Sequence, residues 1–192
     1  MIMAPGLRRL ALTAHVAVSV GWLGAVICFL ALAAVGLTSR NPQTVRGAYL
    51  VMEPAAWLAL VPLSLASLVT GLVSSLGTAW GLFRHYWVLF KLLINVFATT
   101  ILLIYMGTFR QMAAAAADAG ADLEVVRNAS PLVHAALALL LLVAATVLGI
   151  YKPRGMTRYG RHKQHGWGTG DAALDEAETP HDGTAATRPV NL

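Results

Sequence analysis

Residues 10–39 read LALTAHVAVSVGWLGAVICFLALAAVGLTS and contain no Asp, Glu, Lys or Arg. A helix that crosses roughly 30 Å of hydrocarbon needs about 20 mostly apolar residues, so this stretch is long enough to span a membrane. It follows Arg8 and Arg9, as the core of a signal peptide would, but it is longer than the roughly 7–15 apolar residues of such a core. We therefore expect an uncleaved first span over residues 10–35.

Three further stretches are almost free of charge. Residues 54–83 and 128–151 carry none, and residues 85–109 carry only Lys91. These runs predict spans over 54–76, 87–108 and 131–151. They are continuously apolar, whereas barrel strands alternate, and open sheet edges do not exist in lipid. The chain is 57% hydrophobic and 12% charged, which excludes a water-soluble domain. We predict an all-α, multi-pass integral membrane four-helix bundle over residues 1–151, located in the plasma membrane.

Proline and alanine predict the helix boundaries. Glu53-Pro54 and Ser130-Pro131 place a proline where a helix tolerates it, at the first position. The second span is therefore expected to start near Pro54, and the fourth near Pro131. Ala113–Ala117 are strong helix formers and should prolong the third span until Asp118.

The distribution of lysine and arginine predicts the orientation, because these residues accumulate in the short loops on the cytoplasmic side of a membrane. With four spans, eight such residues share the side of both termini and four share the other, so both termini are expected in the cytoplasm. The tail, 152–192, is basic and then acidic, and its composition predicts disorder. The basic half contains Lys152, Arg154, Arg158, Arg161 and Lys163. These residues should lie next to the bilayer and could bind anionic lipids. The alternative is that they serve only as a topology signal.

Four polar side chains lie inside the predicted spans, where polar groups are costly and are candidates for function. By helical rise, His15 and Lys91 lie at similar depth near the cytoplasmic face, and Asn95 shares the helix face of Lys91. We expect His15, Lys91 and Asn95 to line one cavity with Thr70 or Ser74. His134 enters from the other side and is expected to form a separate outer polar site with Glu53.

Each of these residues has a structural alternative that stays open. Lys91 could extend its ammonium to the headgroups, the two histidines could be interfacial, and Asn95 could hydrogen-bond between helices. The single cysteine, Cys28, excludes a disulfide within the chain and a Cys-rich zinc site. The sequence holds no recognisable catalytic set and no nucleic-acid module. A noncatalytic role is favoured over an enzyme, and a homo-oligomer stays open.

Several motifs carry a resemblance to known families. His15 is followed by GWLGA at 21–25, TGL at 70–72, GTAWGL at 77–82 and WVLFKL at 87–92. Residues 7–151 thereby resemble the integral membrane proteins of domain-of-unknown-function family 2269. The wider pattern is similar to the copper-resistance protein D family and to the four-helix protoporphyrinogen oxidase of the HemJ type.

The HemJ resemblance implies haem b as a cofactor, with His15 as an iron ligand and Lys91 pairing a haem propionate or tuning the site. It also suggests His85 as a second axial ligand, although the flanking sequence departs from that oxidase. The resemblance to protein D implies copper handling, for which His134 would be grouped with Met52, Met106 and Met112.

Three hypotheses follow from these patterns. The first is a noncatalytic bundle that binds haem or another small ligand near His15, Lys91 and Asn95. The second is a HemJ-type redox enzyme, which would need an electron acceptor. The third is an accessory membrane protein whose polar residues are structural.

Overall fold

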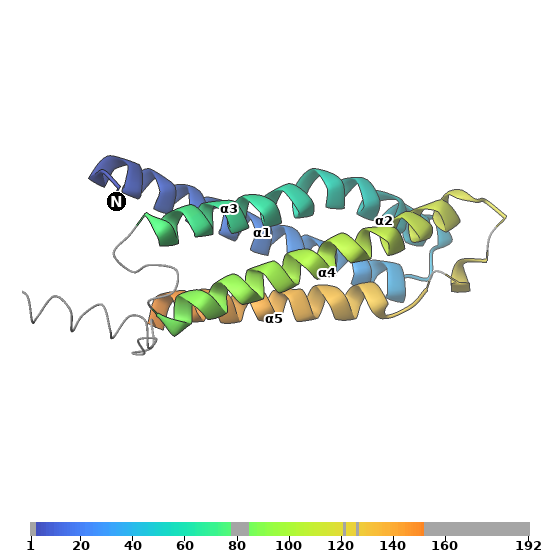
Figure 1. Ribbon diagram of the computed structural model, residues 1–192. Coiled ribbons are helices and arrows are strands. Elements are labelled where there is room, and N and C mark those ends of the chain that lie inside the picture. The colour runs from blue at the N-terminus through green and yellow to red at the C-terminus, as the bar shows by residue number, and fades with distance from the viewer. Residues whose placement is uncertain (1–2, 78–84, 121, 126, 152–192) are drawn as a thin grey trace, which may run out of the picture.

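Four helical rods run antiparallel along one axis in a computed structural model of the chain (Figure 1). It describes residues 3–77, 85–120, 122–125 and 127–151, and these residues form helices and no strand. The first rod is α1 (Pro5–Thr38), and the second joins α2 (Pro42–Ala55), η1 (Ala56–Leu60) and α3 (Val61–Leu76). The third and fourth are α4 (Tyr86–Ala117) and α5 (Ser130–Tyr151), and the short η2 (Leu123–Val125) lies between them. The predicted all-α bundle is confirmed.

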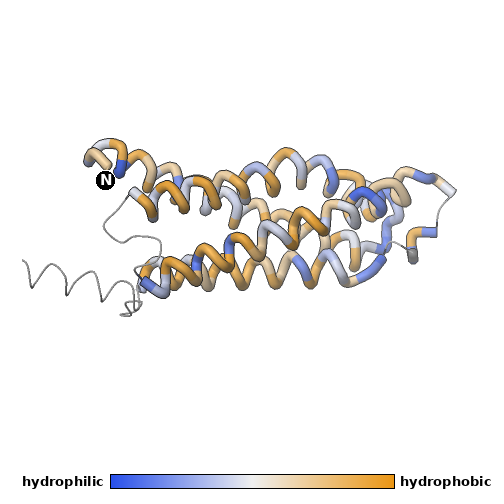
Figure 2. Tube along the Cα trace, in the orientation of Figure 1, coloured by the Kyte–Doolittle hydropathy of each residue, from blue (hydrophilic) through white to orange (hydrophobic). Residues whose placement is uncertain are grey.

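The outside of the bundle is apolar. All four rods are long and apolar enough to cross a membrane. Leu58, Ile104 and Leu140 are 81%, 70% and 65% exposed, whereas Ser64, Ser67 and Thr99 are buried. In Figure 2 the colour of hydrophobic residues predominates along the length of the rods, and hydrophilic residues are most frequent at the end away from the N-terminus. An apolar exterior along all four rods, with these polar side chains turned inward, is the pattern of a multi-pass membrane protein in contact with lipid.

The second rod begins at Pro42 rather than near Pro54, so the predicted start was wrong. The Asn41 side chain accepts a hydrogen bond from the Gln43 backbone N–H at 2.9 Å and caps α2, with Pro42 at its first position. Pro54 lies inside α2, two residues before the π-helical turn η1 begins, and the rod continues through both.

Arg46 and Glu53, the charged residues that argued against a span over residues 42–53, both have polar partners. Arg46 donates hydrogen bonds to the carbonyls of Ala116 at 3.0 Å and Ala119 at 3.2 Å, and to that of Asp118. Glu53 pairs with Arg110 at 3.5 Å. Because these contacts join α2 to the end of α4, the charged segment can remain helical.

The other predicted boundaries are close to those observed. The alanines at 113–117 prolong α4 to Ala117, and the Asp118 carboxylate accepts a hydrogen bond from the Gly120 N–H at 2.9 Å. The fourth helix begins at Ser130. The tail from residue 152, with its predicted disorder and its basic lipid-binding segment, lies outside the described residues.

The packed core occupies one half of the bundle. We call the end where α1 and α4 begin the N-terminal end, and the other the opposite end. Trp22, Val26, Phe29 and Ala33 recur on one face of α1 and pack with Val45, Tyr49 and Met52 of α2 and with Met106, Phe109 and Met112 of α4. The Phe29 and Phe109 rings meet edge to face at 5.5 Å. Before Trp22, no described residue of α1 is buried, so the N-terminal half is packed less tightly.

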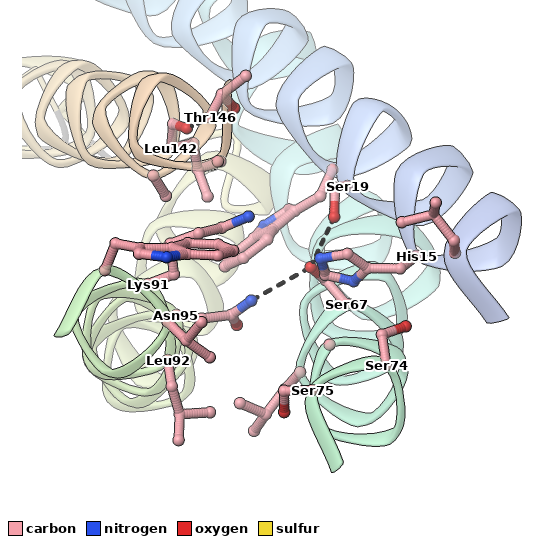
Figure 3. Close-up of a pocket in the computed structure, with 18 of the residues that line it drawn as sticks. His15, Ser19, Ser67, Ser74, Ser75, Lys91, Leu92, Asn95, Leu142 and Thr146 are labelled. Atoms are coloured by element: carbon pink, nitrogen blue, oxygen red, sulfur yellow. Dashed lines mark hydrogen bonds between the residues drawn. The ribbon is translucent and has the colours of Figure 1, made fainter. Parts of the chain in front are cut away.

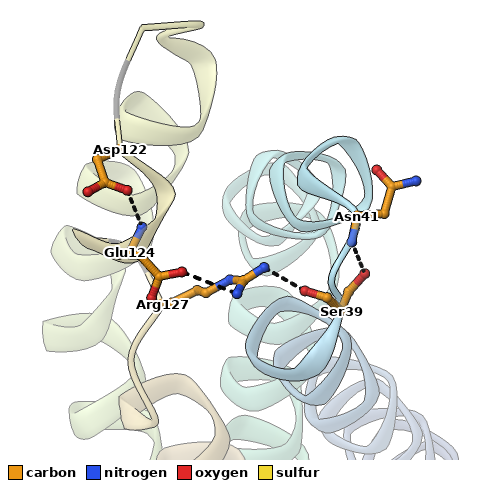
Figure 4. Close-up of polar contacts among 5 residues, drawn as sticks. All are labelled: Ser39, Asn41, Asp122, Glu124 and Arg127. Atoms are coloured by element: carbon orange, nitrogen blue, oxygen red, sulfur yellow. Dashed lines mark hydrogen bonds and ion pairs between the residues drawn. The ribbon is translucent and has the colours of Figure 1, made fainter.

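Arg127 holds the loop before α5 at the opposite end (Figure 4). Its guanidinium donates to the Ser39 carbonyl at 2.5 Å and pairs with Glu124 at 3.3 Å. The Ser39 hydroxyl in turn accepts from the Asn41 N–H at 3.3 Å. These contacts tie the α4–α5 loop to the turn between α1 and α2.

Candidate functional site

A cavity of about 600 Å³ opens between α1, α3, α4 and α5 at the N-terminal end. We call it the N-terminal cavity. It occupies the half of the bundle in which α1 lacks buried residues. His15, Lys91, Asn95 and Ser74 line it, and Thr70 lies behind His15. The structure therefore brings the predicted residues together, as Figure 3 shows.

Two polar contacts join α1 to α3. His15 Nδ1 lies 3.1 Å from Thr70 Oγ1, and the hydroxyls of Ser19 and Ser67 lie 3.0 Å apart. Asn95 of α4 donates from Nδ2 to the same Ser67 hydroxyl at 3.2 Å. The predicted interhelical role of Asn95 is thus present, and Ser67 is the point where three helices meet.

The Thr70 hydroxyl determines which nitrogen of His15 carries the proton. Thr70 Oγ1 donates to the Ala66 carbonyl at 2.6 Å. Because a hydroxyl has one hydrogen, Oγ1 must accept from His15 Nδ1. A neutral imidazole protonated on Nδ1 keeps its lone pair on Nε2. Histidines that bind metals are held in this way, with the other ring nitrogen donating a hydrogen bond.

Gly71 allows the His15 ring to lie against α3. A Cβ added at Gly71 would be 3.0 Å from His15 Cε1, closer than most Cβ contacts. The TGL motif at 70–72 therefore supplies both the hydrogen-bond acceptor and the space for the ring.

Lys91 enters the cavity from α4, on the side facing His15 (Figure 3). A Cβ added at Gly149 of α5 would lie 2.8 Å from Lys91 Nζ. The ammonium therefore lies against the neighbouring helix, inside the bundle. The carboxylates of the described chain, Glu53, Asp118, Asp122 and Glu124, do not line the cavity.

Sequence reasoning missed several lining residues. Ser19 and Ser67 were overlooked because serine is frequent in membrane spans, although their positions four after His15 and three before Thr70 place them on the same faces. Arg8 and Arg9 were read only as topology signals, and they line the cavity as well. Gly149 has no recognisable signal in the sequence.

The predicted outer pair, His134 and Glu53, is not joined by a contact in the structure. His134 Nδ1 donates to the Ser130 carbonyl at 2.8 Å, and its ring stacks on Tyr105 with the ring centroids 4.3 Å apart. Glu53 forms an ion pair with Arg110. Each of the two residues therefore has a partner other than the predicted one.

His134 instead lines a second, mostly apolar cavity of about 230 Å³, whose walls come chiefly from α1, α4 and α5. Trp22 lies between this cavity and the N-terminal one and lines both. Met52 also lines the second cavity, whereas Met106 and Met112 pack in the core without lining it. The three methionines do not gather around His134. Within the described ranges no three His, Cys, Asp or Glu residues are grouped to hold a metal.

His85 does not line the N-terminal cavity, although Trp87 beside it does. The rings of His85 and Trp87 lie 6.4 Å apart. Within the ranges that the structure describes, the cavity lining therefore offers one histidine, His15, to a ligand.

No family model, curated protein or solved structure matches this chain.

Proposed function

We propose that this protein binds a small amphiphilic molecule in the N-terminal cavity, and that haem b is the first candidate. The observation that carries the proposal is His15, whose Nδ1 is held by Thr70 so that Nε2 retains its lone pair. The cavity, at about 600 Å³, has the size of a small-molecule site, for which the range is about 300–1,000 Å³.

The residues present fit haem. His15 would be the axial ligand, and Lys91 would pair a propionate. Trp22, Leu23 and Leu142 supply apolar wall for the macrocycle. When bound, haem b would supply electron transfer or ligand binding at its iron.

A titration with haemin tests this proposal. We expect the purified protein in detergent to give a Soret band that saturates at one haem per chain. The His15→Ala variant should weaken binding at least about tenfold, the effect typical of losing a metal-site residue. The control is His134→Ala, which removes a histidine outside the cavity and should bind as the native protein does. Equal spectra and affinities for native protein and His15→Ala would contradict the proposal.

A redox reaction of the HemJ type is the second candidate. His15 and Lys91, the pair that the resemblance implies, both line this cavity, and this observation favours the redox reaction. Reduction of the haem-loaded protein by protoporphyrinogen would support it. A haem that stays oxidised under those conditions would contradict the redox reaction and leave haem binding as the only supported function.

We further propose that both termini lie in the cytoplasm and that the protein resides in the plasma membrane. The eight-to-four distribution of Lys and Arg supports this orientation. It would bring the basic residues of 152–163 next to the inner leaflet, where anionic headgroups attract them.

A further inference from the structure

The N-terminal cavity gathers positive charge. Arg8, Arg9 and Lys91 line it, and among the residues that the structure describes no carboxylate lines it. Arg8 and Arg9 are exposed at the mouth, whereas Lys91 is half-buried against α5. An ammonium removed from water loses much of its hydration and usually has an anionic partner. In the part of the chain that the structure describes, Lys91 has none.

The same cavity contains polar atoms that lack hydrogen bonds. Ser74 Oγ and Asn95 Oδ1 are buried and have no partner within the described residues. Both residues line the cavity. Buried polar atoms are nearly always satisfied, so these two point to a ligand or water that completes the site.

The remaining wall is apolar. Trp22, Leu23 and Leu142 lie deeper in the bundle than the arginines, since Trp22 belongs to the buried core while Arg8 and Arg9 are exposed. A molecule that fills the cavity would therefore meet cations at the N-terminal end and hydrocarbon or aromatic surface further in.

From these observations we propose that the N-terminal cavity selects molecules with a carboxylate on an apolar body, and that Lys91 pairs the carboxylate. This inference rests on the proposed function, because it names the chemical class that the ligand-binding cavity accepts. A fatty acid and a haem propionate share this chemistry.

The alternative is that Lys91 only packs against α5. In that case its charge would not affect which ligand binds, and its removal would weaken all ligands alike or none. A matched pair of ligands that differ only in charge separates the two readings.

The probes are cis-parinaric acid and its methyl ester, titrated into the detergent-solubilised full-length chain and followed by energy transfer from tryptophan. Partitioning of each probe into micelles is the same for every variant, so it cancels when variants are compared. A second arm uses haemin and haemin dimethyl ester, and shows whether the carboxylate comes from a fatty acid or a porphyrin.

The variants are Lys91→Gln, which removes the charge, and Lys91→Arg, which keeps it. We expect the preference for acid over ester to fall by about tenfold in Lys91→Gln, the size expected for one charge-assisted contact. It should recover in Lys91→Arg. Neutralising Arg8 and Arg9 together should have a smaller effect, because exposed charges are screened by salt.

The outcomes separate the two proposals. An acid preference for parinarate that depends on Lys91, without any haem binding, supports this inference and removes haem as the ligand. Binding of acid and ester with the same ratio in native protein and Lys91→Gln overturns the inference and leaves ligand binding intact. Binding of none of the four probes overturns both.

Discussion

Thr70 holds His15 through one hydrogen bond of 3.1 Å, and that bond sets the nitrogen that can face a ligand. Replacing Thr70 by valine keeps the shape of the side chain but removes the oxygen. The His15 ring would then lose both its fixed tautomer and its orientation. We predict that Thr70→Val lowers haemin affinity by about 10-fold or more, the usual effect of removing a residue that orients a metal ligand. The measurement is a Soret titration.

A control for this variant is Thr146→Val. Thr146 also lines the cavity, but its hydroxyl bonds to the Leu142 carbonyl at 2.8 Å within its own helix. Thr146→Val should therefore leave the affinity for haemin nearly unchanged. If both variants lost affinity equally, the effect would belong to the cavity in general and not to the orientation of His15.

Gly36 permits a close contact between α1 and α2. A Cβ added there would lie 2.9 Å from Tyr49 Cζ, and Tyr49 is only 1% exposed, so its ring cannot move away. We predict that Gly36→Ala lowers the free energy of unfolding by about 1–3 kcal/mol, the cost of overpacking. Thermal unfolding in detergent would show it.

The matched control is Gly24→Ala in the same helix, where no atom lies within 4 Å of the added Cβ. This variant should be neutral or slightly more stable, because alanine favours helix over glycine. Equal losses in the two variants would contradict the role of the Tyr49 contact, because a methyl group would then destabilise α1 even where it meets no neighbour.

At the residue scale the sequence identifies the cavity through rare side chains. His15, Lys91 and Asn95 stand out because charged and amide groups are costly in an apolar span, and these three share one cavity. Ser19 and Ser67 do not stand out, because a serine can satisfy its hydroxyl on its own helix. The partner of Glu53 could not be predicted, because its ion pair with Arg110 depends on how α2 packs on α4.

Among the elements, α2 is joined to the end of α4 by Arg46. Its guanidinium donates to the carbonyls of Ala116, Asp118 and Ala119, which no longer find partners within the helix. We predict that Arg46→Ala lowers the free energy of unfolding by about 1–3 kcal/mol, because it leaves carbonyls without donors. Chemical unfolding followed by circular dichroism would measure it.

Arg110→Ala provides the comparison for Arg46. Arg110 also pairs across α2 and α4, but its side chain is 72% exposed. Exposed ion pairs contribute about 0–1 kcal/mol, so this variant should be nearly neutral. A larger loss for Arg110→Ala than for Arg46→Ala would contradict the capping role.

The helices themselves could be predicted where charge and composition change together. The ends of α4 and the start of α5 follow from Ala113–Ala117 and from Ser130. The start of the second rod could not be predicted, because Pro54 and two paired charges imitate a boundary. The π-helical turn η1 that follows Pro54 in the rod has no recognisable sequence signal.

For the whole molecule, the first question is its orientation in the membrane. Ala119 is exposed in the α4–α5 loop, beyond the end of α4. In a background in which Cys28 is replaced by serine, we predict that Ala119→Cys is labelled by a membrane-impermeant maleimide in intact cells. Labelling only after the cells are opened would show the inverse orientation.

The buried core and the N-terminal cavity lie in different halves of the bundle, and the smaller second cavity lies beside the core. Core residues of α1, α2 and α4 fill the opposite half, while the cavity of about 600 Å³ lies at the N-terminal end. A stable core in one half can hold the helices apart in the other. We therefore expect the ligand to bind in the N-terminal half, and the packed core of the opposite half to hold the four helices in position.

Filling the cavity tests this account most directly. Ala145 of α5 lines the cavity, whereas its neighbour Ala144 is exposed on the outside and does not. Native mass spectrometry of the purified protein with haemin or parinaric acid would count the bound molecules. We predict that Ala144→Trp binds one ligand as the native protein does and that Ala145→Trp binds none. Equal occupancy in both variants would contradict a ligand site in the N-terminal cavity.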